Sequence, residues 1–241
     1  MTDDVRSELA PTGTLRAGIN MANVLLVTGR TASGDPDGVA PDMAREIARR
    51  IGVDVAFVPY PSPGELADAA GADVWDIGMI GAEPSRAETI DFTAAYVEIE
   101  ATYLVPDDSP FREIEDVDAE GVRIAISGRS AYDLYLSRTL QHAELVRAKG
   151  LPGASKLYLD EKLDALAGLR PALLDDHDRL GGRILDGCFT TIQQAIGIRR
   201  GKDGAAAWLR DFVEETKASG FVGGLIERHG VVGRLSVAPP A

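Results

Sequence analysis

The apolar positions in the first part of the chain change period several times. Three short segments have the alternating or mostly apolar composition of strands: residues 15–20, 54–60 and 74–80. Between the first two, Met43, Ile47 and Ile51 recur at every fourth residue, which predicts a helix that ends at Gly52. A shorter helix is predicted over residues 64–70. This alternation of strands and helices is typical of a parallel sheet covered by helices.

Two long extended segments, residues 90–105 and 189–199, divide the rest of the chain. The first ends at a turn-rich break over residues 106–110, where Pro, Asp and Ser dominate. The other expected elements are a strand over residues 122–127, helices over 130–140 and 160–167, a strand over 183–185, and helices over 205–219 and 222–228. Residues 236–241 are expected to form a loose tail.

This order of elements predicts an α/β fold with two lobes, each a mainly parallel sheet with covering helices. The two extended segments would be crossings between the lobes. Lobe 1 is then discontinuous, with residues 1–104 and 196–241, and lobe 2 comprises residues 105–195. Because pockets form at lobe interfaces and at the carboxyl ends of strands, a ligand cleft is expected between the lobes.

Composition narrows the class of protein. The chain has 241 residues, of which 45% are hydrophobic and 26% are charged, as in ordinary globular proteins. No apolar run approaches the ~18 residues that a membrane span needs. A net charge of −13 opposes binding to nucleic acid or anionic lipid, and no basic patch offsets it.

Candidate cofactor chemistry is sparse. Cys188 is the single cysteine and the three histidines are scattered, so the sequence predicts no metal-ligand cluster, no nucleophile with a partner, and no cofactor. The amino terminus is charged, with no apolar stretch before Thr14. The expected location is therefore cytoplasmic if Met1 is the native start, and periplasmic if a signal peptide was trimmed.

Several spaced motifs resemble one protein family. They are "TGTLRAGIN", "GDPDGVAPDMAREIARRIGVDVAFVPY", "WDIGMIGAEPSRAETIDFTAAY" and the late "FTTIQQAIGIRRG" with "FVEETKASGFVGGLIERHG". In this order they resemble the bacterial extracellular solute-binding proteins of family 3, the polar amino-acid-binding components of ABC importers. The match runs from about Thr12 to about Gly230. It implies the type II periplasmic-binding-protein fold, a small-molecule ligand and an ABC permease as a partner. A monomer is expected.

The resemblance assigns the ligand's carboxylate to Arg86, which precedes the segment from Asp91 to Tyr96. A guanidinium suits this role because it stays charged and donates two parallel N–H bonds to a carboxylate. An exposed loop arginine is the alternative. Gly81 and Ala82 match the backbone stretch that holds the same ligand, although the family's threonine is missing there.

In lobe 2, residues 127–131 lead from a strand into a helix. Ser130, with Asp133 three residues later, has the pattern of a helix cap, and the free N–H groups at such a terminus, including that of Ala131, attract an anion. The resemblance implies a second carboxylate contact here. Arg129 is either an extra cation at the cleft or an exposed salt-bridge partner, and Tyr132 either stacks on a ligand or packs within its helix.

One departure from the family concerns the ligand's amino group. Where amino-acid binders have an aspartate under the α-ammonium, this chain has residues 169–172, which include Arg170 and Pro171. Either the ligand lacks an amino group or another acid takes over, since an uncompensated charge would cost several kcal/mol. Glu98 and Glu100 are the candidates, because alternate residues of a strand share one face.

Two further polar residues are predicted at the floor of the cleft. They are Asn20, at the end of the first strand, and Gln193 (or its neighbour Gln194), in the second crossing. Asn20 could instead cap a turn, and one of the glutamines would face solvent.

The predicted function is capture of a small carboxylate-bearing molecule, amino-acid-like or an organic acid, with hinge closure of the lobes. The alternative is a cytoplasmic lyase on the same scaffold, similar to cyclohexadienyl dehydratase, with a protonated Glu98 or Glu100 as general acid.

Overall fold

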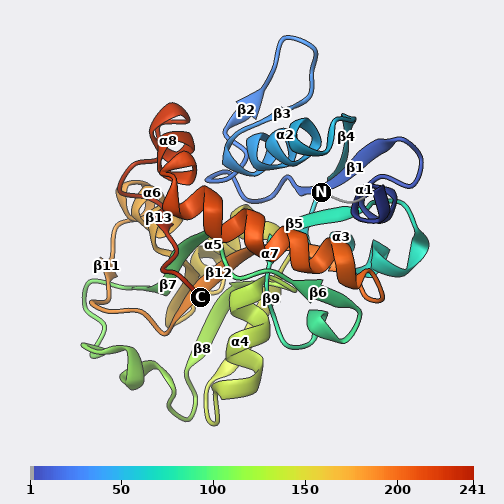
Figure 1. Ribbon diagram of the computed structural model, residues 1–241. Helices are drawn as coiled ribbons and strands as arrows, with labels where there is room; N and C mark the ends of the chain where they lie inside the picture. Colours follow the sequence, from blue (N-terminus) through green and yellow to red (C-terminus); the bar gives the residue numbers. More distant parts are fainter. Residues whose placement is uncertain (1–2) are drawn as a thin grey trace. The chain divides into compact units, whose positions relative to one another are not determined.

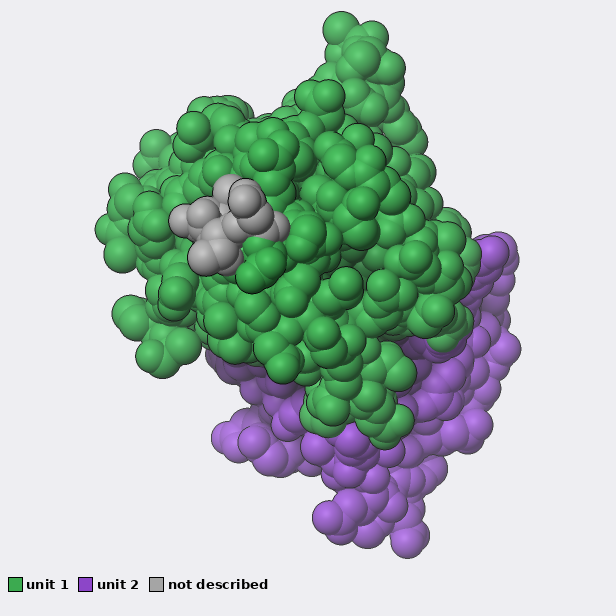
Figure 2. Space-filling model, turned by 45° about the vertical axis from the view of Figure 1, so that its right-hand side comes forward, with its two compact units in different colours: residues 1–98, 193–241 green, residues 99–192 purple. Residues whose placement is uncertain are grey.

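The computed structural model describes residues 3–241 (Figure 1). Met1 and Thr2, with which the charged amino terminus begins, lie outside the described residues. The chain divides into two compact units: unit 1 has residues 1–98 and 193–241, and unit 2 has residues 99–192 (Figure 2). Both changes of unit fall inside a strand, β7 (Val97–Val105) and β12 (Thr190–Arg199). The predicted boundaries, after residues 104 and 195, fall inside the same two strands.

The sheet of unit 1 has the strand order β4 (Asp54–Tyr60), β1 (Thr14–Asn20), β5 (Ile77–Gly81), β12. β1 is parallel to both of its neighbours, and β12 is antiparallel to β5. Every residue of β5 is buried, as expected of a central strand that is covered on both faces. The short strands of this unit are β2 (Gly29–Arg30), β3 (Pro36–Asp37), β6 (Ile90–Phe92) and β13 (Ser236–Val237).

The helices of unit 1 are α1 (Asp3–Leu9), α2 (Val39–Ile51), α3 (Pro63–Asp68), α7 (Asp203–Ala218) and α8 (Phe221–Arg228), with 3-10 turns η1 (Ala69–Ala72) and η2 (Arg86–Glu88). The predicted helix around Met43, Ile47 and Ile51 is confirmed, and these side chains are at most 1% exposed. It ends at Gly52 in the left-handed conformation, φ 69°, which glycine adopts without strain.

The strands of unit 2 also pair in both parallel and antiparallel fashion. β8 (Arg123–Ser127) is parallel to β9 (Glu144–Ala148) and to β10 (Ala165–Leu169), while β7 is antiparallel to β10 and to β11 (Arg183–Ile184). Its helices are α4 (Ala131–Thr139), α5 (Gly150–Asp160) and α6 (Arg170–Leu180), with a 3-10 turn η3 (Ile114–Val117). Its apolar core is built from the strands, α4, α5 and α6.

The structure corrects three predicted elements. The helix predicted over residues 160–167 is wrong: α5 ends at Asp160 and the buried run 165–169 is β10. The extended segment 90–105 is interrupted between β6 and β7. Residues 236–241 are not a loose tail, because β13 pairs with β7 and Ala238 is 4% exposed.

Among residues 3–241, no helix combines the length and the apolar character that crossing a bilayer requires.

Candidate functional site

Arg86 lies in η2, directly after the turn that follows β5. Its residue surface is 5% exposed, so the expectation of an exposed loop arginine does not describe it. Nη1 donates to the Gly81 carbonyl oxygen at 2.7 Å, which orients the guanidinium at the carboxyl end of the central strand. The Ala82 N–H donates to the Gln193 carbonyl at 2.8 Å, so β12 holds the same stretch of backbone. Arg86, Gly81, Ala82 and Gln193 are therefore brought together in unit 1.

Glu83 was not among the predicted site residues, yet it belongs to the same turn as Arg86. Its carbonyl accepts hydrogen bonds from the N–H groups of Arg86 and Ala87, both at 3.0 Å, which makes residues 83–87 a single helical turn. Its side chain is buried, with the residue 8% exposed. The sequence signal was an acidic residue between an apolar strand and the key arginine, in "GAEPSR".

Two other predicted residues of unit 1 have local partners. Asn20 ends β1, and its Oδ1 accepts from the Ala22 N–H at 3.2 Å, which is the turn-capping arrangement. Glu98 accepts from Gln193 Nε2 at 2.8 Å. The carboxylate and the amide thus bind each other across β7 and β12.

In unit 2, β8 leads through a tight turn into α4. Ser130 is the N-cap of α4, and its Oγ accepts from the Asp133 N–H at 3.1 Å, as the capping pattern predicted. Arg129 is exposed and adopts φ +62°, a left-handed conformation that is strained for a residue with a Cβ. Its N–H donates to Asp133 Oδ2 at 2.6 Å. The turn therefore presents the N–H end of α4 beside an arginine, which favours an anion.

The buried carboxylate of Asp133 holds this turn in place through hydrogen bonds. Asp133 is 3% exposed, and its Oδ1 accepts from Arg147 Nε at 2.9 Å. Tyr132 is packed in the core of unit 2, and this burial raises the pKa of its phenol to about 12 although hydrogen bonds with Ser130 and Ser127 oppose the rise. The helix-packing interpretation of Tyr132 therefore describes it better than stacking on a ligand.

Glu100 and Arg170 form an ion pair in unit 2. Arg170 Nε donates to Glu100 Oε2 at 2.6 Å, and its other nitrogens donate to the carbonyls of Leu185 and Gly187. Pro171 lies in the first turn of α6, where its missing N–H is harmless. The second candidate acceptor for a ligand amine is thus bound to a cation of its own chain.

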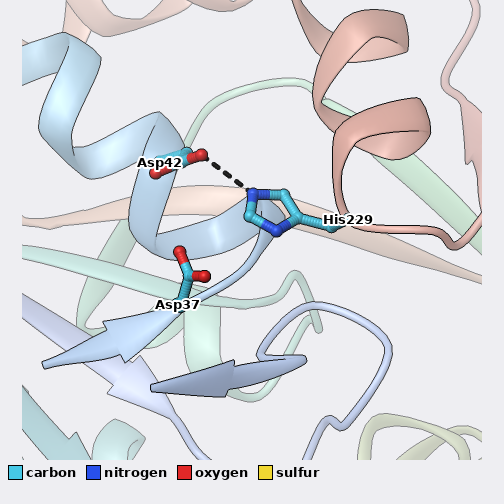
Figure 3. A group of neighbouring side chains, drawn as sticks. All are labelled: Asp37, Asp42 and His229. Carbon is cyan, nitrogen blue, oxygen red and sulfur yellow. Dashed lines mark hydrogen bonds and ion pairs between the residues drawn. The ribbon is translucent and has the colours of Figure 1, made fainter. Parts of the chain in front are cut away.

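Among residues 3–241, the fold brings together a group with metal-ligand geometry, which corrects the expectation that no histidine joins such a cluster. Ligand atoms of Asp37, Asp42 and His229 lie within 4.8 Å of one another, and His229 Nε2 is 2.8 Å from Asp42 Oδ2 (Figure 3). Arg45 Nη1 lies 2.7 Å from Asp42 and 3.6 Å from Asp37, and Arg228 lies 3.3 Å from Asp42. Since two guanidinium groups already balance the two carboxylates, the group is better explained as an ionic contact between α2 and α8.

Two cavities of about 310 and 380 Å³ open in unit 2. They share Asp107 and Gly182 and are lined by apolar side chains such as Leu163 and Leu174. Neither contains a predicted site residue.

The model of the family described as bacterial extracellular solute-binding proteins, family 3, matches residues 16–231. A search among curated proteins found no match.

Solved structures show the same fold at low identity. An ancestral amino-acid-binding protein, a precursor of cyclohexadienyl dehydratase, has TM-score 0.74 at 22% identity, covering 92% of this chain and 98% of that one. A binding component of an ABC transporter from Wolinella succinogenes, complexed with lysine, has TM-score 0.75 at 21% identity, covering 90% and 95%. A substrate-binding protein from Streptococcus pneumoniae bound to L-arginine has TM-score 0.75 at 17% identity, covering 97% and 99%. The predicted α/β fold of the type II periplasmic-binding proteins is confirmed.

Proposed function

Because the chain belongs to the bacterial extracellular solute-binding proteins of family 3, we propose that it captures a small molecule whose carboxylate binds Arg86. The observation that supports this role is the burial of a guanidinium, 5% exposed, at the carboxyl end of a central parallel strand. A buried guanidinium is a strong carboxylate ligand because it stays charged and its donors form a planar fork. The bond to the Gly81 carbonyl keeps that fork in one orientation.

The proposal extends to unit 2, whose turn at residues 127–131 supplies the second contact. Ser130, Ala131 and Arg129 would meet the ligand through the N–H end of α4, while Asn20, Gln193 and the glutamates would orient its remainder. Ligand held by both units would favour a closed state through hinge motion within β7 and β12. The partner is an ABC permease, and the protein acts as a monomer outside the cytoplasm, in keeping with the extracellular members of its family.

The test is calorimetric titration of the purified protein with a panel of amino acids and organic acids. Arg86→Ala should reduce affinity by about 100-fold or more, because it removes a buried charged partner, and Arg86→Lys should reduce it less. Arg49→Ala is the matched control, since the Arg49 side chain is 71% exposed on α2. Unchanged affinity in Arg86→Ala, with the wild type binding the same ligand, would overturn the assignment.

A further inference from the structure

We infer that the two adjoining cavities of unit 2 form one binding site for a small amine, with the ligand's apolar body against the leucines of α5 and α6 and its charged nitrogen at Asp107. None of the residues assigned to the carboxylate ligand lines either cavity. The inference therefore goes beyond the proposed function and does not depend on Arg86.

Four segments of unit 2 line the cavities: the loop after β7, the end of α5 with its following turn, α6, and the turn into β11. Asp107 and Gly182 line both, so the two spaces adjoin, and volumes of about 310 and 380 Å³ are in the range of small-molecule pockets. Gly182, at φ 90°, passes so close to β7 that a Cβ there would lie 2.6 Å from the Val105 carbonyl oxygen. At Gly181 a Cβ would meet nothing within 4 Å, so open space begins directly beside this contact.

Apolar side chains line both cavities and leave surface for a ligand to cover. Leu159 of α5 lines the first cavity and is 48% exposed, and Leu174 of α6 lines the second and is 51% exposed. Leu163, in the wall of the first cavity, is 2% exposed and belongs to the packed core of unit 2. A ligand with an aliphatic or aromatic body would remove the exposed leucine surface from water, which favours binding.

The buried polar group of this site is the hydroxyl of Tyr158. The residue is 7% exposed and lines the first cavity, and no hydrogen bond joins its hydroxyl to any other of residues 3–241. Buried hydroxyls normally have a partner, because leaving one without a partner costs free energy. Burial raises the pKa of this phenol to about 12, and the negative charges of Asp107 and Asp108 add to the rise, so both carboxylates lie near it. An N–H of a bound amine would give the hydroxyl oxygen its missing partner.

The charges around the cavities favour a cation over an anion. Asp107 is exposed, and within residues 3–241 its carboxylate has neither an ion pair nor a hydrogen bond. Arg183, in the second cavity, is bound to backbone, since its Nη2 donates to the Phe111 carbonyl at 2.7 Å. Lys162, in the first cavity, is the cation that opposes an amine. Two adjacent acids, Asp107 and Asp108, and a net charge of −13 outweigh it.

The experiment titrates hexylamine at neutral pH into the isotope-labelled full chain and follows the backbone amide resonances by NMR. Hexanol is the matched neutral ligand, since it has the same apolar body without the charge. The variants are Asp107→Asn, Tyr158→Phe and Lys162→Gln. Glu120→Gln is the control, because Glu120 is an exposed acid of unit 2 that lines neither cavity. Arg86→Ala separates this site from the one proposed for the carboxylate.

Hexylamine should shift the amide resonances of Gly181 and Gly182 with a Kd of about 1–10 mM, as suits a small ligand in an open site. Asp107→Asn should weaken hexylamine about fivefold and hexanol less than about twofold, because only the amine has a charge to lose. Lys162→Gln should strengthen hexylamine about twofold, since it removes the opposing cation. Tyr158→Phe should weaken both ligands about threefold, because each of them bonds to the hydroxyl. Glu120→Gln and Arg86→Ala should change neither ligand.

Equal effects of Asp107→Asn on hexylamine and hexanol would show that the charge is not recognised, and would overturn the inference. Weaker hexylamine binding in Lys162→Gln, or no shift at Gly181 and Gly182 in the wild type, would overturn it as well. Circular dichroism confirms that each variant is folded, and Asp107→Asn, on an exposed loop, keeps the test if Tyr158→Phe fails to fold. Loss of hexylamine binding in Arg86→Ala would also overturn the inference, whereas loss of carboxylate ligands alone in that variant bears only on the proposed function.

Discussion

Replacing Asp133 by alanine should destabilise unit 2 through the turn that precedes α4. The carboxylate accepts from the Arg129 N–H at 2.6 Å and from Arg147 Nε at 2.9 Å, and its side chain is 4% exposed. Alanine removes the acceptor and leaves both donors behind. Because the Arg129 backbone is strained at φ +62°, losing this bond also removes what holds the turn in its conformation.

The expected loss of unfolding free energy depends on how exposed Asp133 and its partner Arg147 are. Removing one member of a buried ion pair costs about 3–5 kcal/mol, and each hydrogen bond to a charged group is worth about 1.5–3 kcal/mol. The Arg147 side chain is 46% exposed and regains water once it is released, which lowers the cost. We therefore expect Asp133→Ala to lower the free energy of unfolding by about 2–4 kcal/mol, and Asp133→Asn, which keeps the volume and one acceptor, by about half as much.

Urea unfolding followed by circular dichroism measures this effect. Tryptophan fluorescence does not replace it, because Trp75 and Trp208, the two tryptophans of the chain, both lie in unit 1. Arg147→Gln completes a double-mutant cycle, in which the coupling with Asp133→Ala should be about 1 kcal/mol or more. A loss below about 0.5 kcal/mol in Asp133→Ala, or strict additivity in the cycle, would refute the argument, since typical surface changes already reach that size.

Two further predictions concern α2. Gly38→Ala should lower the free energy of unfolding by about 3 kcal/mol or more, because φ is 143° and a Cβ would lie 2.3 Å from the Leu26 carbonyl oxygen. Gly52→Ala should lower it by only about 1 kcal/mol, because the space around Gly52 is open. Thermal unfolding of both variants measures the difference. Glu46→Gln should cost about 1–2 kcal/mol at pH 7. Hydrogen bonds from Arg49, joined by those from Arg50, outweigh burial and lower the pKa of Glu46 to about 2, so this stabilisation is present above the ordinary pKa of 4.5 and fades as the pH falls towards 2. A Glu46→Gln deficit as large at pH 2 as at pH 7 would contradict it.

The helices and strands with a regular spacing of apolar residues could be predicted, because those apolar residues are the ones that the fold buries. Met43, Ile47 and Ile51 repeat at the helical period and are buried on one face of α2. Residues 165–169 have no such signal, because a short apolar run fits a buried strand as well as a helix. The arrangement that decides it is tertiary: β10 pairs with β8 on one side and with β7 on the other.

In the candidate site too, some residues could be singled out from the local sequence, whereas others are brought together only by the fold. Arg86 could be singled out because one arginine in a specific motif has a distinct chemistry, and its role as the carboxylate ligand stays a prediction. Glu83 was missed because its one local signal, an acidic residue close before an arginine, is common in a chain with 38 acidic residues and does not reveal burial. His229 shows the same limit: the group that it forms with Asp42 joins residues 187 positions apart.

The two glutamates of β7 show why the ligand's charge could not be inferred from sequence alone. Glu98 and Glu100 share a strand face by period, which made both equal candidates to bind an amine. Their partners lie far along the chain: Gln193 is 95 positions from Glu98, and Arg170 is 70 positions from Glu100. The resemblance puts Pro171 where the family has its aspartate, and the neighbouring Arg170 is the cation that binds Glu100.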